Sequence, residues 1–333
     1  MHPSRILHRR DFCGALLGGA LAGSAVLAQA QAYPSKPIRI LVPFTPGGSA
    51  DLLARSIGTE LGHSLSQPVV VENVPGAGGT IATDRAARSA ADGYTLFMGH
   101  TGTLAVNPSL YPKLNLRPTH DFAPVAWVAR VPNVLVVHPS VPARSLQELV
   151  ALLKSKPGAL SYGSGGNGSA AHITMEYLKL QTGTSALHIP YRGTAPSIND
   201  LLAGQVQMLF TGAPALLPFI KSGKMRALAV SSDKRLAALP DVPTVAQTGV
   251  PGTAGFEADQ WYGLVAPAGT PPDIVARLNQ QINASLSSQE VAKRMASEGA
   301  EPTPTTPQAF AQLIDKEVLR WTDVVKKAKV TVD

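Results

Sequence analysis

Residues 44–51 read Phe44-Thr-Pro-Gly-Gly-Ser-Ala-Asp51. The apolar stretch 38–43 precedes them, and residues 51–61 follow with the apolar spacing of a helix. A strand, a Gly-Gly turn and a helix start, in this order, present backbone N–H groups at the positive end of a helix dipole. The segment has no nucleophile paired with a base, no cluster of metal ligands and no phosphate-binding lysine. It therefore predicts the capture of a small anion rather than chemistry on that anion.

A second Gly-rich loop, Tyr162-Gly-Ser-Gly-Gly-Asn-Gly-Ser169, lies between an expected strand over 159–162 and an expected helix over 170–181. Its glycines fit the string G-x-G-x-x-G, but a dinucleotide site also needs an acidic residue about 20 positions later. The sequence there is Leu187-His-Ile-Pro190, and no lysine follows the last glycine. We interpret the loop as another anion-binding helix N-terminus. A tight turn without a ligand is the alternative, and the presence of two such loops weakens it.

Residues 1–32 have the organisation of a secretory signal peptide. A charged start is followed by a weakly apolar run over 12–27 and by two small-x-small cleavage sites that end at Ala30 and Ala32. The expected location is therefore the periplasm. The pair Arg9-Arg10 leaves export by the twin-arginine route and by the general secretory route both open.

Length and charge limit the function further. The chain has 333 residues, and the length that remains after the predicted signal favours two domains. Its only cysteine, Cys13, lies within that signal. The formal net charge of +7 is scattered, with no basic run interleaved with aromatic residues, so the sequence argues against a nucleic-acid partner. A mild positive balance suits the attraction of small anions.

Strand-like and helix-like patterns alternate along the chain, which predicts an α/β fold with mostly parallel sheets and helices on both faces. Two apolar stretches, 122–130 and 256–265, each carry a tryptophan and are interpreted as crossings between domains. The first domain is then expected to comprise residues 33–130 and 256–333, and the second to comprise residues 131–255.

Several single residues admit a structural role as well as a functional one. Asp51 is favoured as a partner of the helix dipole over a ligand contact. His172 and Glu176 stand one helical turn apart, but a metal site needs more ligands, so a capping role is favoured for His172. Ser164 and Ser169 do not lie in a G-x-S-x-G motif, which makes a hydrolase a weak interpretation. For Tyr191-Arg192, ligand contact and a solvated loop stay equally open.

A series of short motifs runs in order from Tyr33 to the C-terminal end. They are Tyr33-Pro-Ser-Lys-Pro-Ile-Arg39, Val42–Asp51, Val71–Gly79, Asp92-Gly-Tyr-Thr-Leu96, Tyr162–Ser169, Ile189-Pro-Tyr-Arg-Gly193, Ala237–Val245 and Trp261–Pro272. Together they resemble the Bug family, the extracytoplasmic solute receptors of tripartite tricarboxylate transporters. The resemblance implies a type II-like periplasmic binding protein whose two α/β domains close on a ligand in the cleft between them. It also implies a small carboxylate ligand, held largely by backbone N–H groups and bridging waters of the two loops.

With this resemblance, we expect carboxylate oxygens to be held by the two loops, and the far end of the ligand to be shaped by neighbouring strand ends. The expected ligand-binding residues are Thr45, Gly47, Gly48, Asp51, Thr101, Ser164, Gly165, Gly166, Asn167, Gly168, Ser169, His172, Tyr191 and Thr211. Neither a cofactor nor a metal is expected. The expected state is a monomer without enzymatic activity that serves a membrane permease of the tripartite tricarboxylate type. The alternatives are a secreted serine hydrolase using Ser164 or Ser169, and a ligand-presenting sensor protein.

One position departs from the family pattern. Members often have Asp after the Phe that ends the strand before Pro214, whereas here Phe210 is followed by Thr211. A carboxylate pairs with a ligand amine and a neutral hydroxyl does not. The departure therefore favours a ligand without an amine.

Overall fold

The computed structural model describes residues 33–332, so the predicted signal peptide over 1–32, with Arg9-Arg10 and Cys13, lies outside the described residues. The compact unit that begins at Lys36 contains both sheets and all the contacts discussed below. Among the described residues, no helix is both long enough and apolar enough to cross a membrane.

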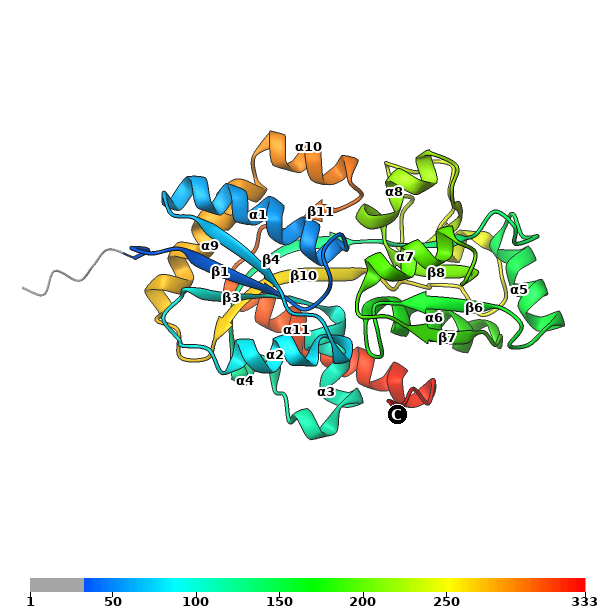
Figure 1. The fold of residues 1–333 in the computed structure, drawn as a ribbon, viewed down its shortest axis with the longest axis horizontal. Coiled ribbons are helices and arrows are strands. Elements are labelled where there is room, and N and C mark those ends of the chain that lie inside the picture. The colour runs from blue at the N-terminus through cyan, green and yellow to red at the C-terminus, as the bar shows by residue number, and fades with distance from the viewer. Residues whose placement is uncertain (1–32, 333) are drawn as a thin grey trace, which may run out of the picture. The chain divides into compact units, whose positions relative to one another are not determined.

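The first sheet has six strands in the order β11-β4-β10-β3-β1-β2. β1 runs parallel to β2 and β3, whereas β10 runs antiparallel to β3 and β4. Figure 1 shows α1 and α9 on one face of this sheet and α2 and α11 on the other. The strands are β1 Ile38–Val42, β2 Val69–Asn73, β3 Thr95–His100, β4 Phe122–Val131, β10 Gln260–Pro267 and β11 Glu301–Pro302. The helices are α1 Ser49–Leu65, α2 Thr80–Ala87, α3 Asn107–Leu110, α4 Pro118–Asp121, α9 Pro272–Leu286, α10 Gln289–Ser297 and α11 Pro307–Lys327.

The second sheet has five strands in the order β7-β6-β8-β5-β9. β6 runs parallel to β7 and β8, whereas β5 runs antiparallel to β8 and β9. The strands are β5 Asn133–Val137, β6 Ser161–Ser164, β7 Leu187–Pro190, β8 Met208–Gly212 and β9 Arg226–Val230, and the helices are α5 Leu146–Ser155, α6 Ala170–Thr182, α7 Thr194–Leu202 and α8 Ala213–Lys221. Short helical turns complete the chain at η1 Ala77–Gly79, η2 Thr101–Val106 (π-helical), η3 Pro112–Leu114 and η4 Ala246–Thr248.

The α/β class predicted from the sequence is confirmed, but both sheets are mixed rather than mostly parallel. The antiparallel strands are those through which the chain passes from one sheet to the other. β4 ends at Val131 and β5 begins at Asn133, so only Pro132 separates the two sheets there. We call the first sheet with α1–α4 and α9–α11 the first lobe, and the second sheet with α5–α8 the second lobe.

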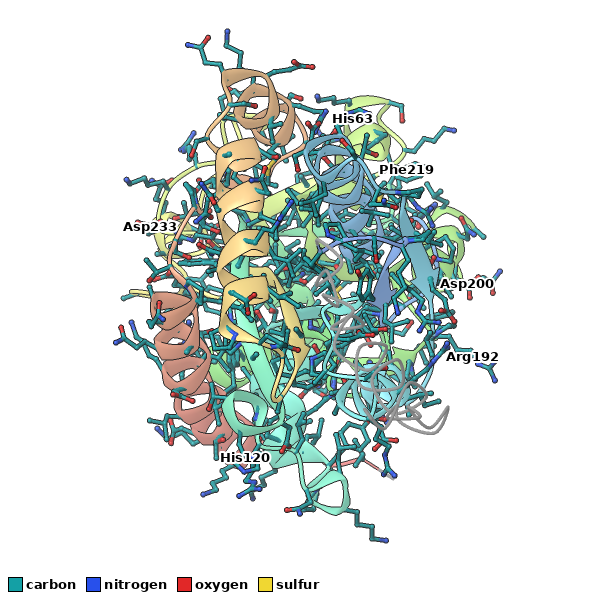
Figure 2. The ribbon with its side chains drawn as sticks, turned by 90° about the vertical axis from the view of Figure 1, so that its left-hand side faces the viewer. His63, His120, Arg192, Asp200, Phe219 and Asp233 are labelled. Carbon is teal, nitrogen blue, oxygen red and sulfur yellow. The ribbon has the colours of Figure 1, made fainter. Side chains whose placement is uncertain are left out.

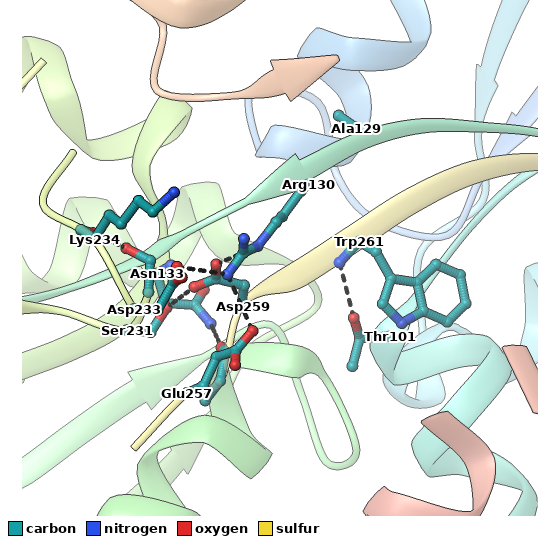
Figure 3. A network of polar contacts seen from close by, with 12 residues as sticks. Thr101, Ala129, Arg130, Asn133, Ser231, Asp233, Lys234, Glu257, Asp259 and Trp261 are labelled. Atoms are coloured by element: carbon teal, nitrogen blue, oxygen red, sulfur yellow. Dashed lines mark hydrogen bonds and ion pairs between the residues drawn. The ribbon is translucent and has the colours of Figure 1, made fainter. Parts of the chain in front are cut away.

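A polar network joins the segments that connect the two sheets (Figure 3). The side-chain amide of Asn133 donates to the carbonyl of Ala258 at 2.7 Å, and the Asn133 backbone N–H donates to Ser231 Oγ at 2.8 Å. Arg130, on β4, lies 2.8 Å from the Asp259 carboxylate through its Nε. Burial raises the pKa of Asp259 to about 6, although the Arg130 charge acts to lower it. These contacts hold the two chain segments that connect the sheets, one at Asn133 and the other between Ser231 and Asp259, next to each other.

Helix α1 shows how the pattern of the sequence becomes packing. Its buried residues Leu53, Ile57 and Leu61 recur every fourth position and therefore lie on one face. The helix spans Ser49–Leu65, close to the range 51–64 that the apolar spacing predicts. Packing of this face fixes the start of α1, and with it the Gly-Gly turn, against the first sheet.

Candidate ligand-binding site

The two lobes meet where several helices begin. Helices α1, α6 and α7 each follow a strand that takes part in parallel pairing, so their N-termini gather at the carboxyl ends of the strands. Their N-cap residues are Gly48, Ser169 and Gly193, and neither glycine position has a side-chain cap. The first N–H groups of a helix have no partner within it, and the helix dipole makes that end positive. The arrangement concentrates positive backbone potential at one place.

A small inner cavity lies among these helix starts. Its volume is about 10 Å³, close to what one water molecule occupies. None of the residues that line it is a lysine, arginine, aspartate or glutamate. They are Phe44, Gly48, Ser49, Ala50, His100, Gly165, Ser169, Ala170, Ala171, Thr194, Thr211, Gln260 and Tyr262. The cavity therefore offers uncharged donors and helix N-termini to an anion.

A larger outer pocket of about 620 Å³ opens beside the same loops. The first lobe contributes Thr45, Ala77, Gly78 and Tyr111, and the second lobe contributes Gly166, Asn167, Pro190, Tyr191, Arg192 and Pro196. Arg192 is the only cationic side chain among them, and Figure 2 shows it projecting outward from the molecule. The Tyr191 hydroxyl donates to the Asp200 carboxylate at 2.5 Å, which leaves no proton on it for a ligand. Burial and this carboxylate raise the pKa of Tyr191 to about 12.

The first Gly-rich loop is held from within by Asp51. One carboxylate oxygen accepts the Gly47 N–H at 3.0 Å, and the other accepts from Arg55 at 2.8 Å and from the Asn73 amide at 3.0 Å. Asn73 also donates to the Phe44 carbonyl at 2.9 Å. Burial acts to raise the pKa of Asp51, but these hydrogen bonds outweigh it and lower the pKa. Asp51 and Gly47 thus shape the loop, and neither lines the cavity or the outer pocket.

The second Gly-rich loop is held from behind by two histidines. Ser164 Oγ lies 2.6 Å from His188 Nε2 and accepts the Gly166 N–H at 3.1 Å. His172 Nδ1 accepts the Gly168 N–H at 3.1 Å, and its ring stacks on that of His188 with centroids 4.0 Å apart. Burial lowers the pKa of His172 to about 4 and, with the neighbouring His172 ring, that of His188 to about 3. Both rings are therefore neutral at pH 7.

The two lobes are in direct contact beside the second Gly-rich loop. The Tyr111 hydroxyl of the first lobe donates to the Asn167 carbonyl of the second at 3.0 Å. A Cβ added to Gly78, whose φ is +59°, would lie 1.9 Å from that same carbonyl oxygen. A Cβ on Gly48 would lie 3.5 Å from Thr194, an ordinary contact distance. The close approach of the lobes thus depends on glycine at Gly78 rather than at Gly48.

The structure divides the residues that the sequence singled out. Those that line the cavity or the outer pocket are Thr45, Gly48, Gly165, Gly166, Asn167, Ser169, Tyr191 and Thr211. The others line neither space and bond or pack within the surrounding structure: Gly47, Asp51, Thr101, Ser164, Gly168 and His172. Thr101, for example, accepts the backbone N–H of Trp261 at 3.0 Å, as Figure 3 shows. A Cβ on Gly168 would lie 2.3 Å from Asn107 Oδ1 of the first lobe.

Sequence reasoning missed several lining residues, of which His100, Gln260 and Tyr262 are the most polar. His100 comes directly after the apolar run of β3, a place where a polar side chain points to a site at the strand end. Gln260 and Tyr262 begin β10, far along the chain from the two loops. Only the pairing of β10 with β3 brings Tyr262 opposite His100. Within residues 33–332, no group of three or more His, Cys, Asp or Glu side chains is arranged to hold a metal ion.

Comparison with known proteins identifies the family of this chain. The family described as "Tripartite tricarboxylate transporter family receptor" matches residues 53–330. Protein BugT of Bordetella pertussis is 43% identical over 92% of this chain and 94% of its own length. A Rhodopseudomonas palustris protein solved with adipate is 37% identical, with a TM-score of 0.86 over 90% of this chain and 99% of that one. MatC of the same organism, solved with malate, is 35% identical, with a TM-score of 0.83 over 88% and 100%.

Proposed function

This chain belongs to the tripartite tricarboxylate transporter receptor family, and we propose that it is a periplasmic solute-binding protein that captures a small organic carboxylate. It then presents the ligand to a membrane permease of the tripartite tricarboxylate type. The membership in the Bug group predicted from the sequence motifs is confirmed.

The observation that carries the proposal is the inner cavity. Helix N-termini and neutral donors surround it, and no charged side chain lines it. Backbone N–H groups at helix starts stabilise a carboxylate without a counter-ion and without the desolvation of a buried cation. Adipate and malate, which two relatives hold in their solved structures, are small anions of this class. Both facts support a carboxylate ligand.

The ligand is proposed to enter when the lobes separate about the Arg130–Asn133 network. In the arrangement described here the inner cavity holds little more than one water, so a carboxylate of several carbons requires the loops to part or to shift. We propose residues 33–130 and 256–333 as one moving body and 131–255 as the other. Thr45, Gly48, Gly165, Gly166, Asn167, Ser169, Tyr191 and Thr211 are proposed to contact the ligand. Asp51, Ser164 and His172 are proposed to hold the loops in shape.

A serine hydrolase has one observation in its favour, the distance of 2.6 Å between Ser164 Oγ and His188 Nε2. The Ser164 residue is only 1% exposed, however, and it lines neither the cavity nor the outer pocket. A catalytic serine must lie within hydrogen-bond range of its base and must also be accessible to the carbonyl carbon of a substrate. We therefore propose binding without turnover, and export to the periplasm by the predicted signal over 1–32.

The test is calorimetric titration and thermal melting of the exported protein with adipate, malate and citrate. Adipamide serves as the neutral control of matched length. We expect one ligand per chain, unchanged ligand after prolonged incubation, and stabilisation of about 2.7 kcal/mol at a hundredfold excess over Kd. A melting shift with adipamide or glucose but with none of the carboxylates would overturn the proposal. Product formation in the same incubation would favour the hydrolase.

A further inference from the structure

His100 occupies a special position at the edge of the inner cavity. It ends β3 and caps the π-helical turn η2, where its Nδ1 accepts the Thr103 N–H at 3.0 Å. The residue is 2% exposed and lines the cavity. Its ring contacts the rings of Phe44 and Tyr262, with centroid distances of 5.0 and 5.6 Å.

The contacts of the ring fix its tautomer. Burial lowers the pKa of His100 to about 4, so the ring is neutral at pH 7. Because Nδ1 accepts a backbone N–H, the single hydrogen of the neutral ring is on Nε2. Nδ1 faces Thr103 of η2, and the residue also lines the cavity, where Ser169 and Ala170 of the second lobe are among its neighbours.

The Nε2 hydrogen of His100 has no acceptor among residues 33–332, although the ring is almost fully buried. Its polar neighbours are already engaged. Tyr262 donates its hydroxyl to Gln260, and Gln260 donates its amide to Asn133. A donor at the edge of a cavity that has no acceptor in the protein is satisfied by water or by the molecule that binds there.

From this geometry we propose that His100 donates its Nε2 hydrogen to an oxygen at the inner end of the ligand and so selects for ligands with an acceptor there. The inference rests on the proposed function, because it needs a carboxylate in this cavity. A ligand with a carboxylate, hydroxyl or keto oxygen at that end satisfies the donor. A methyl group leaves the donor without a partner. An ammonium group places a positive charge next to the N–H hydrogen and next to three helix N-termini, all of which are electropositive.

Two substitutions separate ligand contact from the capping of η2. In His100→Asn the side-chain oxygen takes the place of Nδ1 and keeps the cap, but the distal donor is lost. In His100→Gln the amide nitrogen reaches the place of Nε2, but the cap is lost. We expect His100→Asn to weaken adipate binding about tenfold or more, equal to about 1.4 kcal/mol. His100→Gln is expected to bind within about threefold of wild type, or about 0.6 kcal/mol, despite a lower melting temperature without ligand.

Matched ligands test the selection directly. Adipate, hexanoate and 6-aminohexanoate share a chain length and differ in one end group, as do succinate, butyrate and 4-aminobutyrate. We expect wild type to prefer the diacid within each set, and the ratio of diacid to monoacid affinity to shrink in His100→Asn. A protected Nε2 proton, observed by NMR of the imidazole upon addition of the diacid, is an independent readout that a purely structural role would not produce.

The outcomes distinguish the two proposals. If wild type binds none of these carboxylates, the proposed function fails and this inference fails with it. If wild type binds the diacid and His100→Asn binds it equally well, only the inference about His100 is overturned. That inference is also overturned if His100→Gln is the variant that loses binding, because the cap rather than the donor then matters.

Discussion

The hydroxyl of Tyr111 donates a hydrogen bond of 3.0 Å to the backbone carbonyl of Asn167. Tyr111 follows α3 in the first lobe, whereas Asn167 lies in the Gly-rich loop of the second. This bond exists only while the two lobes are together. It therefore favours the closed arrangement over an open one and adds nothing to the stability of either lobe alone.

Tyr111→Phe is expected to weaken carboxylate binding about fivefold, because one neutral hydrogen bond contributes about 1 kcal/mol to the closed form. The melting temperature without ligand should change little. Tyr177→Phe is the matched control, since Tyr177 lines neither the cavity nor the outer pocket and the change keeps its ring contact with Phe256. Calorimetric titration of both variants measures the effect. Equal affinity in Tyr111→Phe and wild type would show that the bond does not contribute to closure.

Gly78→Ala is expected to block closure. The added Cβ would lie 1.9 Å from the Asn167 carbonyl oxygen, and φ at Gly78 is +59°. Gly158→Ala is the control for backbone strain, because Gly158 has φ +72° and nothing within 4 Å of its Cβ position. Both variants should lose about 1 kcal/mol of stability from the left-handed conformation. Only Gly78→Ala should also lose binding, by about tenfold or more.

If titration finds both alanine variants with the same affinity, the close approach at Gly78 is not needed for binding. Small-angle scattering with saturating adipate gives a second readout. We expect Gly158→Ala to contract on binding as wild type does, and Gly78→Ala to stay expanded.

The buried histidine pair predicts the acid sensitivity of the fold. The pKa of His188 is lowered to about 3 in the folded state, against about 6.5 in an unfolded chain. Below pH 6.5 the unfolded chain binds a proton that the folded state does not, so the contribution of His188 to stability is present above that pH. It is lost progressively as the pH falls toward 3. His172, with a pKa of about 4, acts in the same direction.

His188→Gln keeps a polar partner for Ser164 and removes the titration. We expect the free energy of unfolding to fall less steeply in this variant between pH 6.5 and 4, with a difference on the order of 1–2 kcal/mol across that range. Denaturant titrations at several pH values measure the slope. Asp259, whose pKa is raised to about 6, contributes with the opposite sign in both proteins, so it cancels in the comparison. Parallel slopes for wild type and variant would contradict the prediction.

The sequence predicted those features of the site that are formed by consecutive residues. A strand, a Gly-Gly turn and a helix start occupy consecutive residues, so the position of Gly48 at a helix N-terminus follows from periodicity and turn chemistry. The same holds for Ser169, whose hydroxyl caps α6 by accepting the His172 N–H.

The features that could not be predicted depend on residues far apart in the chain, or on which acceptor in the fold takes a given backbone N–H. The Gly47 N–H looked available to a ligand, but the Asp51 carboxylate four residues later accepts it. His100 and Tyr262 meet only because β10 returns antiparallel to β3. Neither spacing nor propensity states which donors a fold leaves free. His100 became a candidate only because the structure shows its Nδ1 accepting the Thr103 N–H, which leaves the hydrogen on Nε2.

Thr211→Asp is expected to weaken the binding of a carboxylate that has no amine, such as adipate. Thr211 is 3% exposed, lines the inner cavity and stands just before Gly212, the N-cap of α8. The helix start would favour the introduced carboxylate, so the fold should persist. No cation lines the cavity to neutralise it, and like charges in close contact cost several kcal/mol. Adipate affinity should fall about a hundredfold or more, whereas the neutral Thr211→Asn should stay within about tenfold of wild type.

Lowering the pH should partly restore adipate binding to Thr211→Asp, because burial raises the pKa of the new carboxyl and protonation removes its charge. Titration of adipate at pH 7 and pH 5 measures both effects, and equal losses in the two variants would show that size rather than charge governs this position.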